Sequence, residues 1–142
     1  GPESEKLKKQ VKSLGLKNIF FAGQVTNEEK ISLIKNCTAL VLSSHLRSEA
    51  FGMVLVEASM MCKPMISCEI GTGTSYVNLH EETGLVVQPE NIDEMHEAMQ
   101  TILNDASLAK TFGENSRRRY ELLFSGPALG QAYKSVYADL IK

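Results

Sequence analysis

Residues 48–58 read Ser48-Glu49-Ala50-Phe51-Gly52-Met53-Val54-Leu55-Val56-Glu57-Ala58, with two glutamates eight positions apart. The apolar segment 38–44 before this stretch and the segment 63–67 after it each predict a buried strand. The order is therefore a strand, a loop that carries Glu49, a helix that carries Glu57, and a second strand. This order is half of a nucleotide-binding α/β unit, in which an anion binds the free amides at the helix N-terminus.

The spacing of the two glutamates suggests the size of a ligand. If residues 49–57 were all helical, a rise of ~1.5 Å per residue would separate Glu49 from Glu57 by roughly 12 Å. This length suits a molecule with a hydroxylated ring at each end and a diphosphate between them. A sugar nucleotide is such a molecule.

The composition is that of an ordinary soluble domain. The chain has 142 residues, of which 43% are hydrophobic and 23% charged, enough to build one real core. The formal net charge of -2 gives no electrostatic reason to expect binding to nucleic acid or to an acidic membrane. No apolar run reaches ~18 residues and the N-terminus has no apolar signal core, so neither a transmembrane helix nor a signal peptide is expected.

Three cysteines, Cys37, Cys62 and Cys68, lie in or beside apolar segments. Their odd number and apolar surroundings favour buried free thiols in a reducing cytoplasm over a disulfide. No Cys-x-x-Cys or Cys-His spacing is present, so we expect no zinc site.

Hydrophobic periodicity and glycine stops predict the other elements. We expect strands at 18–22, 38–44, 63–67 and 84–87, and helices at 5–14, 28–36, around Glu57, from Asp93 onward, at 108–124 and at 127–141. The helix that begins at Asp93 should direct four apolar residues inward, namely Met95, Met99, Ile102 and Leu103. Strands that alternate with helices, each an unbroken apolar run, predict the α/β class with a Rossmann-like parallel sheet covered by helices on both faces.

The beginning of the chain does not fit a complete domain of this class. Such a sheet opens with a strand and has about six strands, whereas here a helix comes first and fewer strands are expected. Either the chain begins inside its domain, without its first βαβ unit, or the sheet is small; Gly1-Pro2 is either native or a protease scar. If two strands are missing beside segment 38–44, we expect its edge to pair directly with strand 18–22 or with another polypeptide.

Several blocks of the sequence resemble one family. Residues 49–58 resemble the Glu-x7-Glu signature of retaining glycosyltransferases with two Rossmann-like domains, the GT-B fold. Three further blocks resemble those of the glycosyl transferases group 1 family in order and spacing, namely Leu14-Gly15-Leu16 with Phe21-Ala22-Gly23, Lys63-Pro64-Met65-Ile66, and Thr83-Gly84-Leu85-Val86-Val87. The resemblance covers nearly all of residues 1–142 and concerns the C-terminal, donor-binding domain of that family.

This resemblance implies roles for the first motif. Glu49 would be the catalytic candidate, facing the donor sugar and accepting hydrogen bonds from its hydroxyls. The amides of Phe51 and Gly52 would reach the sugar hydroxyls. The amides of Met53 and Val54 would bind the diphosphate, since a helix N-terminus favours anions by ~0.3–1 kcal/mol.

The resemblance implies further donor contacts in three other places. Glu57 would hold the ribose hydroxyls. Gly23 and Val25 would lie beside the base, at the carboxyl end of a predicted strand. Gly71 and Gly73, in the loop 68–75, would allow the backbone to approach the donor closely.

Two departures from the family pattern stand out. The run Gly71-Thr72-Gly73-Thr74-Ser75 lacks the glutamate that usually ends this loop, and residues 71–78 instead resemble bacterial O-antigen and polysaccharide transferases, often mannosyltransferases. The family's phosphate-binding arginine and lysine, and its acceptor-binding N-terminal domain, would lie upstream of this chain.

The function that the resemblance implies is retaining transfer of a hexose from a nucleoside-diphosphate sugar to a glycan or lipid-linked acceptor in lipopolysaccharide or polysaccharide biosynthesis. GDP-mannose is favoured over a UDP-sugar as the donor. No metal is expected because no Asp-x-Asp pair is present, and no cofactor is expected beyond the sugar nucleotide itself. The complete enzyme would work in the cytoplasm, with peripheral contact to the inner face of the membrane as an option; the chain alone is expected to be inactive.

Other interpretations stay open. The chain could belong to a sugar-nucleotide epimerase of the same fold or to a non-catalytic partner subunit. Without the resemblance, Glu49 and Glu57 would be a helix-capping acid and a solvated helix residue. His45 either contacts the ligand or is a solvated loop residue, and the run 117–119 of three arginines is favoured as a solvated helix face over a phosphate site.

Overall fold

The structure is a computed structural model that describes residues 2–141. It divides into two compact units, one up to Lys30 and one from Ile31 onward, with the boundary inside helix α2 (Asn27–Asn36).

The first unit holds helix α1 (Ser4–Ser13) and an extended segment without regular structure. Helix α1 ends as expected at a glycine, since Gly15 has φ +66°, and no residue of the helix is buried. The strand expected at 18–22 is wrong: this segment forms no strand, and its Phe20 side chain is 86% exposed. A strand needs a hydrogen-bonded neighbour, and the described part of this unit contains none.

The second unit is built on a sheet of three parallel strands, β1 (Leu40–Leu42), β2 (Met65–Cys68) and β3 (Gly84–Val87), in the order β1-β2-β3. The register pairs Val41 with Ile66 and Ile66 with Leu85. The predicted parallel arrangement is confirmed. Strand β1 is shorter than the expected 38–44, and within the second unit it pairs with β2.

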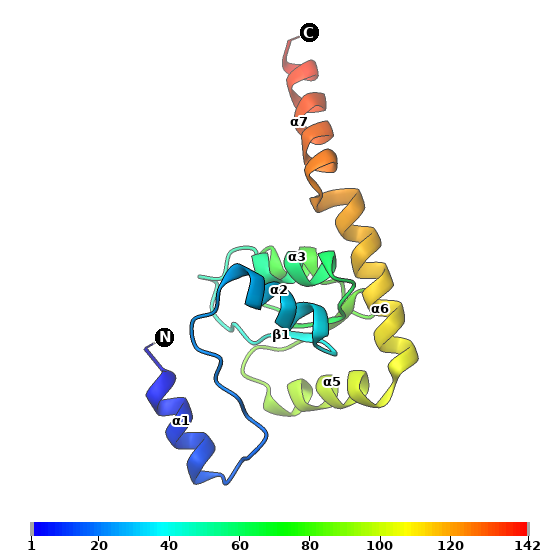
Figure 1. The fold of residues 1–142 in the computed structure, drawn as a ribbon. Helices are drawn as coiled ribbons and strands as arrows, with labels where there is room; N and C mark the ends of the chain where they lie inside the picture. The colour runs from blue at the N-terminus through cyan, green and yellow to red at the C-terminus, as the bar shows by residue number, and fades with distance from the viewer. Residues whose placement is uncertain (1, 142) are drawn as a thin grey trace. The chain divides into compact units, whose positions relative to one another are not determined.

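Helices cover both faces of this sheet. On one face, residues of α2, α3 (Met53–Met60) and α4 (Thr74–Val77) form a core that includes Ile34, Leu55, Val56, Ala58, Met65 and Val77. On the other face, α5 (Ile92–Asn104) completes a second core that includes Ile66, Cys68, Ile70, Val87, Ala98 and Ile102. Because side chains alternate along a strand, Met65 and Ile66 enter different cores. Figure 1 shows α3 and α5 on opposite sides of β1.

Helix α5 is only partly oriented as expected. Ile102 is buried and Met95 is half-buried, but Met99 and Leu103 are 41% and 63% exposed. These two residues, with Ala39 and Val41, line an open apolar hollow of about 150 Å³ at the free edge of β1. The expectation that Met99 and Leu103 point inward is wrong because α5 extends past the edge of a sheet that has three strands in the described chain.

The last elements form a long helical run. Helix α6 (Ala106–Arg119) continues into a π-helical turn, η1 (Tyr120–Phe124), and then into α7 (Gly126–Leu140) after a break at Ser125 (Figure 1). The predicted helix 108–124 is thus one run with a wider last turn. No residue of α7 is buried, and no helix of the described chain is long and apolar enough to cross a membrane.

A close contact between Gly84 and Met65 sets the spacing of β2 and β3. A side chain at Gly84 would overlap the carbonyl oxygen of Met65, so β2 and β3 can approach only with glycine here. The fully buried Asn78 bridges the same two strands: its Nδ2 donates to Ser67 Oγ at 2.9 Å and to the Leu85 carbonyl at 3.1 Å. Asn78 therefore fixes the end of α4 to the sheet.

Candidate functional site

Residues 46–52 form a tight loop, the Glu49 turn, between β1 and α3. The Glu49 amide donates to the Leu46 carbonyl at 3.1 Å, and Glu49 Oε1 accepts the Gly52 amide at 3.0 Å. Gly52 has φ +77° and is the N-terminal cap residue of α3, a conformation that favours glycine. The side chain of Glu49 is thus held over the beginning of α3, as a capping acid would be.

The helix itself begins at Met53, later than the motif spacing assumed. Glu49 lies in the turn, so the estimate of roughly 12 Å for a fully helical stretch does not apply. The first helical amides, those of Met53 and Val54, have no carbonyl partner inside the helix by geometry, and the cap residue Gly52 offers no side-chain acceptor. Glu57 lies one turn further along α3 and is half-buried.

The glycine loop, residues 69–75, packs directly against the Glu49 turn. The Gly73 amide donates to the Ala50 carbonyl and Thr72 Oγ1 donates to the Glu49 carbonyl, both at 2.9 Å. A Cβ at Gly73 would overlap the Phe51 ring. Gly73 therefore permits a close approach of two protein loops, whereas Gly71 adopts the positive φ of +65° that the backbone turn requires.

The structure does not support the reason for placing Gly23 and Val25 beside a base. Both belong to the first unit and follow the segment that forms no strand. Gly23 has φ +71°, with nothing near the position of a Cβ, and Val25 is half-buried. The argument from a strand's carboxyl end is therefore wrong for this pair of residues.

The carboxyl ends of the strands border two hollows. One, of about 190 Å³, is lined in part by Ser43, Cys68 and Gln88, one from the end of each strand or just after it. The other, of about 280 Å³, is lined by Ser44, His45, Leu46, Ser48 and Glu49. His45 lines both, so it lies beyond the carboxyl end of β1, and its contact with a ligand stays a prediction. Gln88 was not predicted from the sequence, because a single polar residue after a strand carries no signal of its own.

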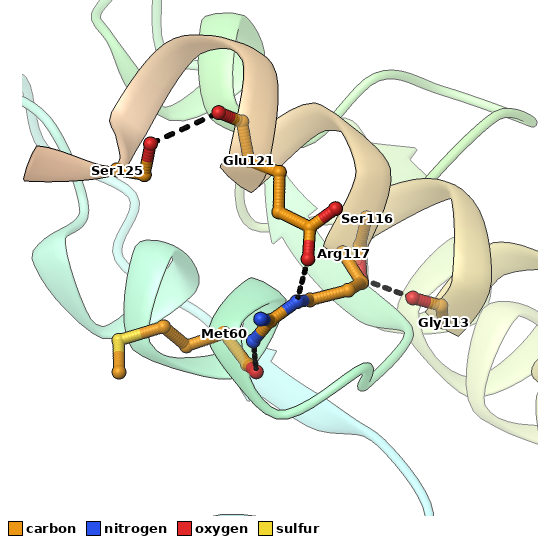
Figure 2. Close-up of polar contacts among 6 residues, drawn as sticks. All are labelled: Met60, Gly113, Ser116, Arg117, Glu121 and Ser125. Atoms are coloured by element: carbon orange, nitrogen blue, oxygen red, sulfur yellow. Dashed lines mark hydrogen bonds and ion pairs between the residues drawn. The ribbon is translucent and has the colours of Figure 1, made fainter. Parts of the chain in front are cut away.

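The three consecutive arginines point to different partners. Arg117 donates through Nη1 to the Met60 carbonyl at the end of α3 and through Nε to Glu121 at 2.8 Å (Figure 2). The hydrogen bond to Glu121 raises the pKa of Arg117 above its ordinary value. Arg118 reaches Asn115 on the surface, and Arg119 binds the backbone of α4. Two of the three guanidinium groups therefore bind backbone carbonyls of neighbouring helices, and the three do not form one continuous phosphate site.

All three cysteines are free thiols, as expected. Cys68 is buried at the end of β2 and Cys37 is half-buried. The expected burial is wrong for Cys62, which is exposed because it lies in the turn that follows α3. Burial raises the pKa of the Cys37 and Cys68 thiols, so both stay protonated near neutral pH.

A parallel sheet with a helix N-terminus and two interlocked loops beyond its carboxyl edge defines an α/β domain of the nucleotide-binding class. The chain belongs to the family described as glycosyl transferases group 1, whose model matches residues 1–119. The family and the fold class predicted from the sequence blocks are both confirmed.

Named relatives are similar over most of the chain. O-antigen chain mannosyltransferase C of Escherichia coli is 39% identical over 142 residues, which are 100% of this chain and 38% of that protein. D-rhamnosyltransferase WbpZ of Pseudomonas aeruginosa is 47% identical over 125 residues, 88% of this chain and 33% of that protein. Among solved structures, sucrose-phosphate synthase from Thermosynechococcus elongatus superimposes with a TM-score of 0.83 at 30% identity, over 98% of this chain and 35% of that chain. The chain thus spans about a third of the length of the curated relatives it matches.

Proposed function

We propose that this chain is the donor-binding part of a glycosyltransferase that makes O-antigen or a related polysaccharide. The complete enzyme transfers a hexose, with retention of configuration, from a nucleoside-diphosphate sugar to a glycan or lipid-linked acceptor. The names of the two relatives, a mannosyltransferase and a rhamnosyltransferase, favour GDP-mannose or a similar GDP-sugar as the donor over a UDP-sugar.

One observation supports this function above the others: the Glu49 turn and the glycine loop are tied together next to the N-terminus of α3. The amides of Met53 and Val54 supply the diphosphate with hydrogen-bond donors and with the positive end of the helix dipole. The same amides stabilise the leaving diphosphate, which is electrostatic catalysis. Glu57, further along α3, binds the ribose hydroxyls.

In this proposal Glu49 faces the reacting sugar. Its Oε1 accepts the Gly52 amide, which fixes the orientation of the carboxylate. A carboxylate has four acceptor positions on two oxygens, so the same group can accept sugar hydroxyls while it holds the turn. The hollow that contains Glu49 and His45, about 280 Å³, receives the sugar.

The remaining components of the enzyme lie outside this chain in our proposal. An N-terminal domain binds the acceptor and closes over the donor, and basic residues from elsewhere in the enzyme complete the diphosphate site. The enzyme works on the cytoplasmic side of the membrane where its lipid-linked acceptor lies.

Saturation-transfer NMR on the complete enzyme, with GDP-mannose, GDP, UDP-glucose and UDP-N-acetylglucosamine as probes, tests this proposal. We expect transfer to the guanine and ribose protons of GDP-mannose, and proton NMR of the product should show the anomeric configuration of the donor. Conversion of the donor to its epimer without an acceptor would indicate an epimerase instead. Binding without any turnover, over a panel of acceptors, would indicate a non-catalytic subunit.

A further inference from the structure

Arg119, the last residue of α6, binds the segment that follows the glycine loop. Its Nε and Nη2 donate to the Tyr76 carbonyl at 3.2 and 2.6 Å, and its guanidinium carbon lies 5.0 Å from the centre of the Tyr76 ring. Tyr76 belongs to α4, a helix of four residues that starts directly after Gly73. So short a helix leaves most of its carbonyls without internal partners, and Arg119 supplies a charged donor to one of them.

Phe124, at the end of η1, contacts the Glu49 turn and the residue that directly follows the glycine loop. Its ring meets the Tyr76 ring edge to face at 5.8 Å and the Phe51 ring edge to face at 6.1 Å. Phe51 belongs to the Glu49 turn, whereas Tyr76 follows the glycine loop. The guanidinium of Arg119 lies 5.8 Å from the centre of the same Phe124 ring. One aromatic ring therefore links the Glu49 turn to α4, the helix that the glycine loop leads into.

The π-helical turn explains how Arg119 and Phe124 reach the same target. In a regular α-helix, residues five apart point about 140° away from each other. The turn 120–124 is wider, and the Ser125 amide closes it by donating to the Tyr120 carbonyl at 2.9 Å. The wider turn brings residues five apart onto one side, and such turns are rare and frequent at functional sites.

The interlock between the two loops rests on few direct bonds. The loops themselves share the hydrogen bonds from Gly73 to Ala50 and from Thr72 to Glu49, and the Tyr76 side chain is 52% exposed. Half-exposed loops with few contacts open easily. Contacts from a long helix outside the loops are therefore needed to hold them in one arrangement.

We propose that Arg119 and Phe124 are positioning residues that hold the glycine loop against the Glu49 turn and so fix the geometry of the donor site. This inference rests on the proposed function. Neither residue touches the donor; both act through Tyr76 and Phe51. Arg117 holds α3 in a similar way, since its hydrogen bond to the Met60 carbonyl anchors the end of that helix (Figure 2).

The first arm of the test measures amide hydrogen exchange in the complete protein without ligand. Arg119→Ala and Phe124→Leu should each speed exchange in the peptide 69–77 by about tenfold, because the loop opens more often. Arg118→Ala is the matched control, since it removes the same charge from the neighbouring position. The Arg118 side chain donates to Asn115 on the surface of the same helix and to neither loop in the described part of the chain. Leu122→Ala, at a side chain that is 69% exposed, is the control for Phe124.

The second arm measures donor kinetics with GDP-mannose. Misplaced site groups lower the rate far more than they lower stability, so Arg119→Ala and Phe124→Leu should reduce kcat by on the order of tenfold or more. Arg119→Lys keeps one charged donor and should recover part of the loss. The control variants should keep both kcat and KM. If Arg119→Ala does not fold, Arg119→Lys and Phe124→Leu carry the test.

Unchanged exchange in 69–77 for both Arg119→Ala and Phe124→Leu would overturn the proposal. Faster exchange with kcat and KM equal to wild type would overturn it too, because the loop would then be held without consequence for the donor. If the wild-type enzyme neither binds nor uses a nucleotide sugar, the proposed function fails and the donor-positioning role falls with it. The exchange arm then still decides whether Arg119 holds the loop.

Discussion

Glu49 has two functions in this interpretation, and they can be separated. The carboxylate accepts the Gly52 amide in the structure, and the proposed function adds contact with the donor sugar. If Glu49 only caps the helix, its substitution should lower the free energy of unfolding. If Glu49 contacts the donor, its substitution should mainly lower kcat.

Substitutions at the two motif glutamates distinguish these functions. Glu49→Ala should lower turnover by ~10²-fold or more, the scale of losing a positioned electrostatic group. Glu49→Gln keeps an oxygen for the Gly52 amide, so its thermal unfolding should match wild type although its turnover falls. Glu57→Ala should mainly weaken nucleotide binding, by ~1–3 kcal/mol, because the ribose hydroxyls lose their acceptor. Near-normal activity for both alanine variants in steady-state assays would refute the site assignment.

The cysteines offer a second test at the residue scale. Burial raises the pKa of the Cys68 and Cys37 thiols, so the reactive thiolate is scarce at both positions at pH 7.5. Cys62 is exposed and its thiol is open to reagents. Iodoacetamide should therefore label Cys62 at least about tenfold faster than Cys68, as followed by peptide mass spectrometry. Equal rates would mean that the end of β2 opens on the timescale of labelling.

Among the elements, the packing of β2 on β3 is the least tolerant part of the fold. Gly84→Ala places a methyl group on the Met65 carbonyl, and the strands must separate to accept it. We expect a loss of about 3 kcal/mol in the free energy of unfolding, measured by urea denaturation.

Gly130 is the matched control for this loss. It lies inside α7 with nothing near the position of a Cβ. Gly130→Ala should therefore stabilise by roughly 0.5–1 kcal/mol, since alanine is the better helix former. A loss at Gly84 no larger than the change at Gly130 would contradict the register of the sheet.

The sequence predicted the strands well where burial on both faces alone determines the residue pattern. The segments 63–67 and 84–87, with Met65-Ile66 and Leu85-Val86-Val87 as their apolar parts, gave β2 and β3, because a strand covered on both faces has no polar side. The run at 18–22 looks the same but forms no strand, since an apolar run does not show whether a neighbouring strand exists. Met99 and Leu103 follow a helical spacing, yet the three-stranded sheet of the described chain ends before it covers them.

The motifs of the candidate site could be predicted from the sequence. The residues that pack behind these motifs could not. Glu49, Phe51, Gly52 and Gly73 lie together in the structure, whereas their contacts with a donor stay a prediction. Tyr76 and Arg119 are 43 positions apart, and no spacing rule joins them. The π-helical turn is equally hidden, because residues 120–124 fit an ordinary helical pattern. Long-range contacts of this kind come from the tertiary structure alone.

At the scale of the whole molecule, stability is distributed unevenly. The first unit has a helix without a buried residue and a long exposed segment, whereas the second unit contains both apolar cores. The exposed hydrophobic side chains of the first unit include Ile19, Phe20 and Phe21. Local opening should be most frequent in this part of the chain.

Limited proteolysis of the isolated chain checks this distribution. Lys17 is exposed in a segment without regular structure, whereas Lys110 is exposed on helix α6 of the second unit. Trypsin should cut after Lys17 well before it cuts after Lys110, because cleavage needs a segment that can unfold locally. Early cleavage after Lys110, detected by mass spectrometry, would show that the second unit is not the stable one.

The π-helical turn also gives the chain an unusual sensitivity to a change of length. A gene that lost one codon within 120–124 would encode a helix whose later residues are rotated by about 100° and drawn in by about 1.5 Å. Phe124 would then face away from Tyr76 and Phe51, and the row of exposed side chains on α7 that includes Leu129, Tyr133 and Tyr137 would present itself in a new direction. A substitution in this turn changes one side chain. Deletion of one residue there would change both the contacts of the donor site and the direction in which the side chains of α7 point.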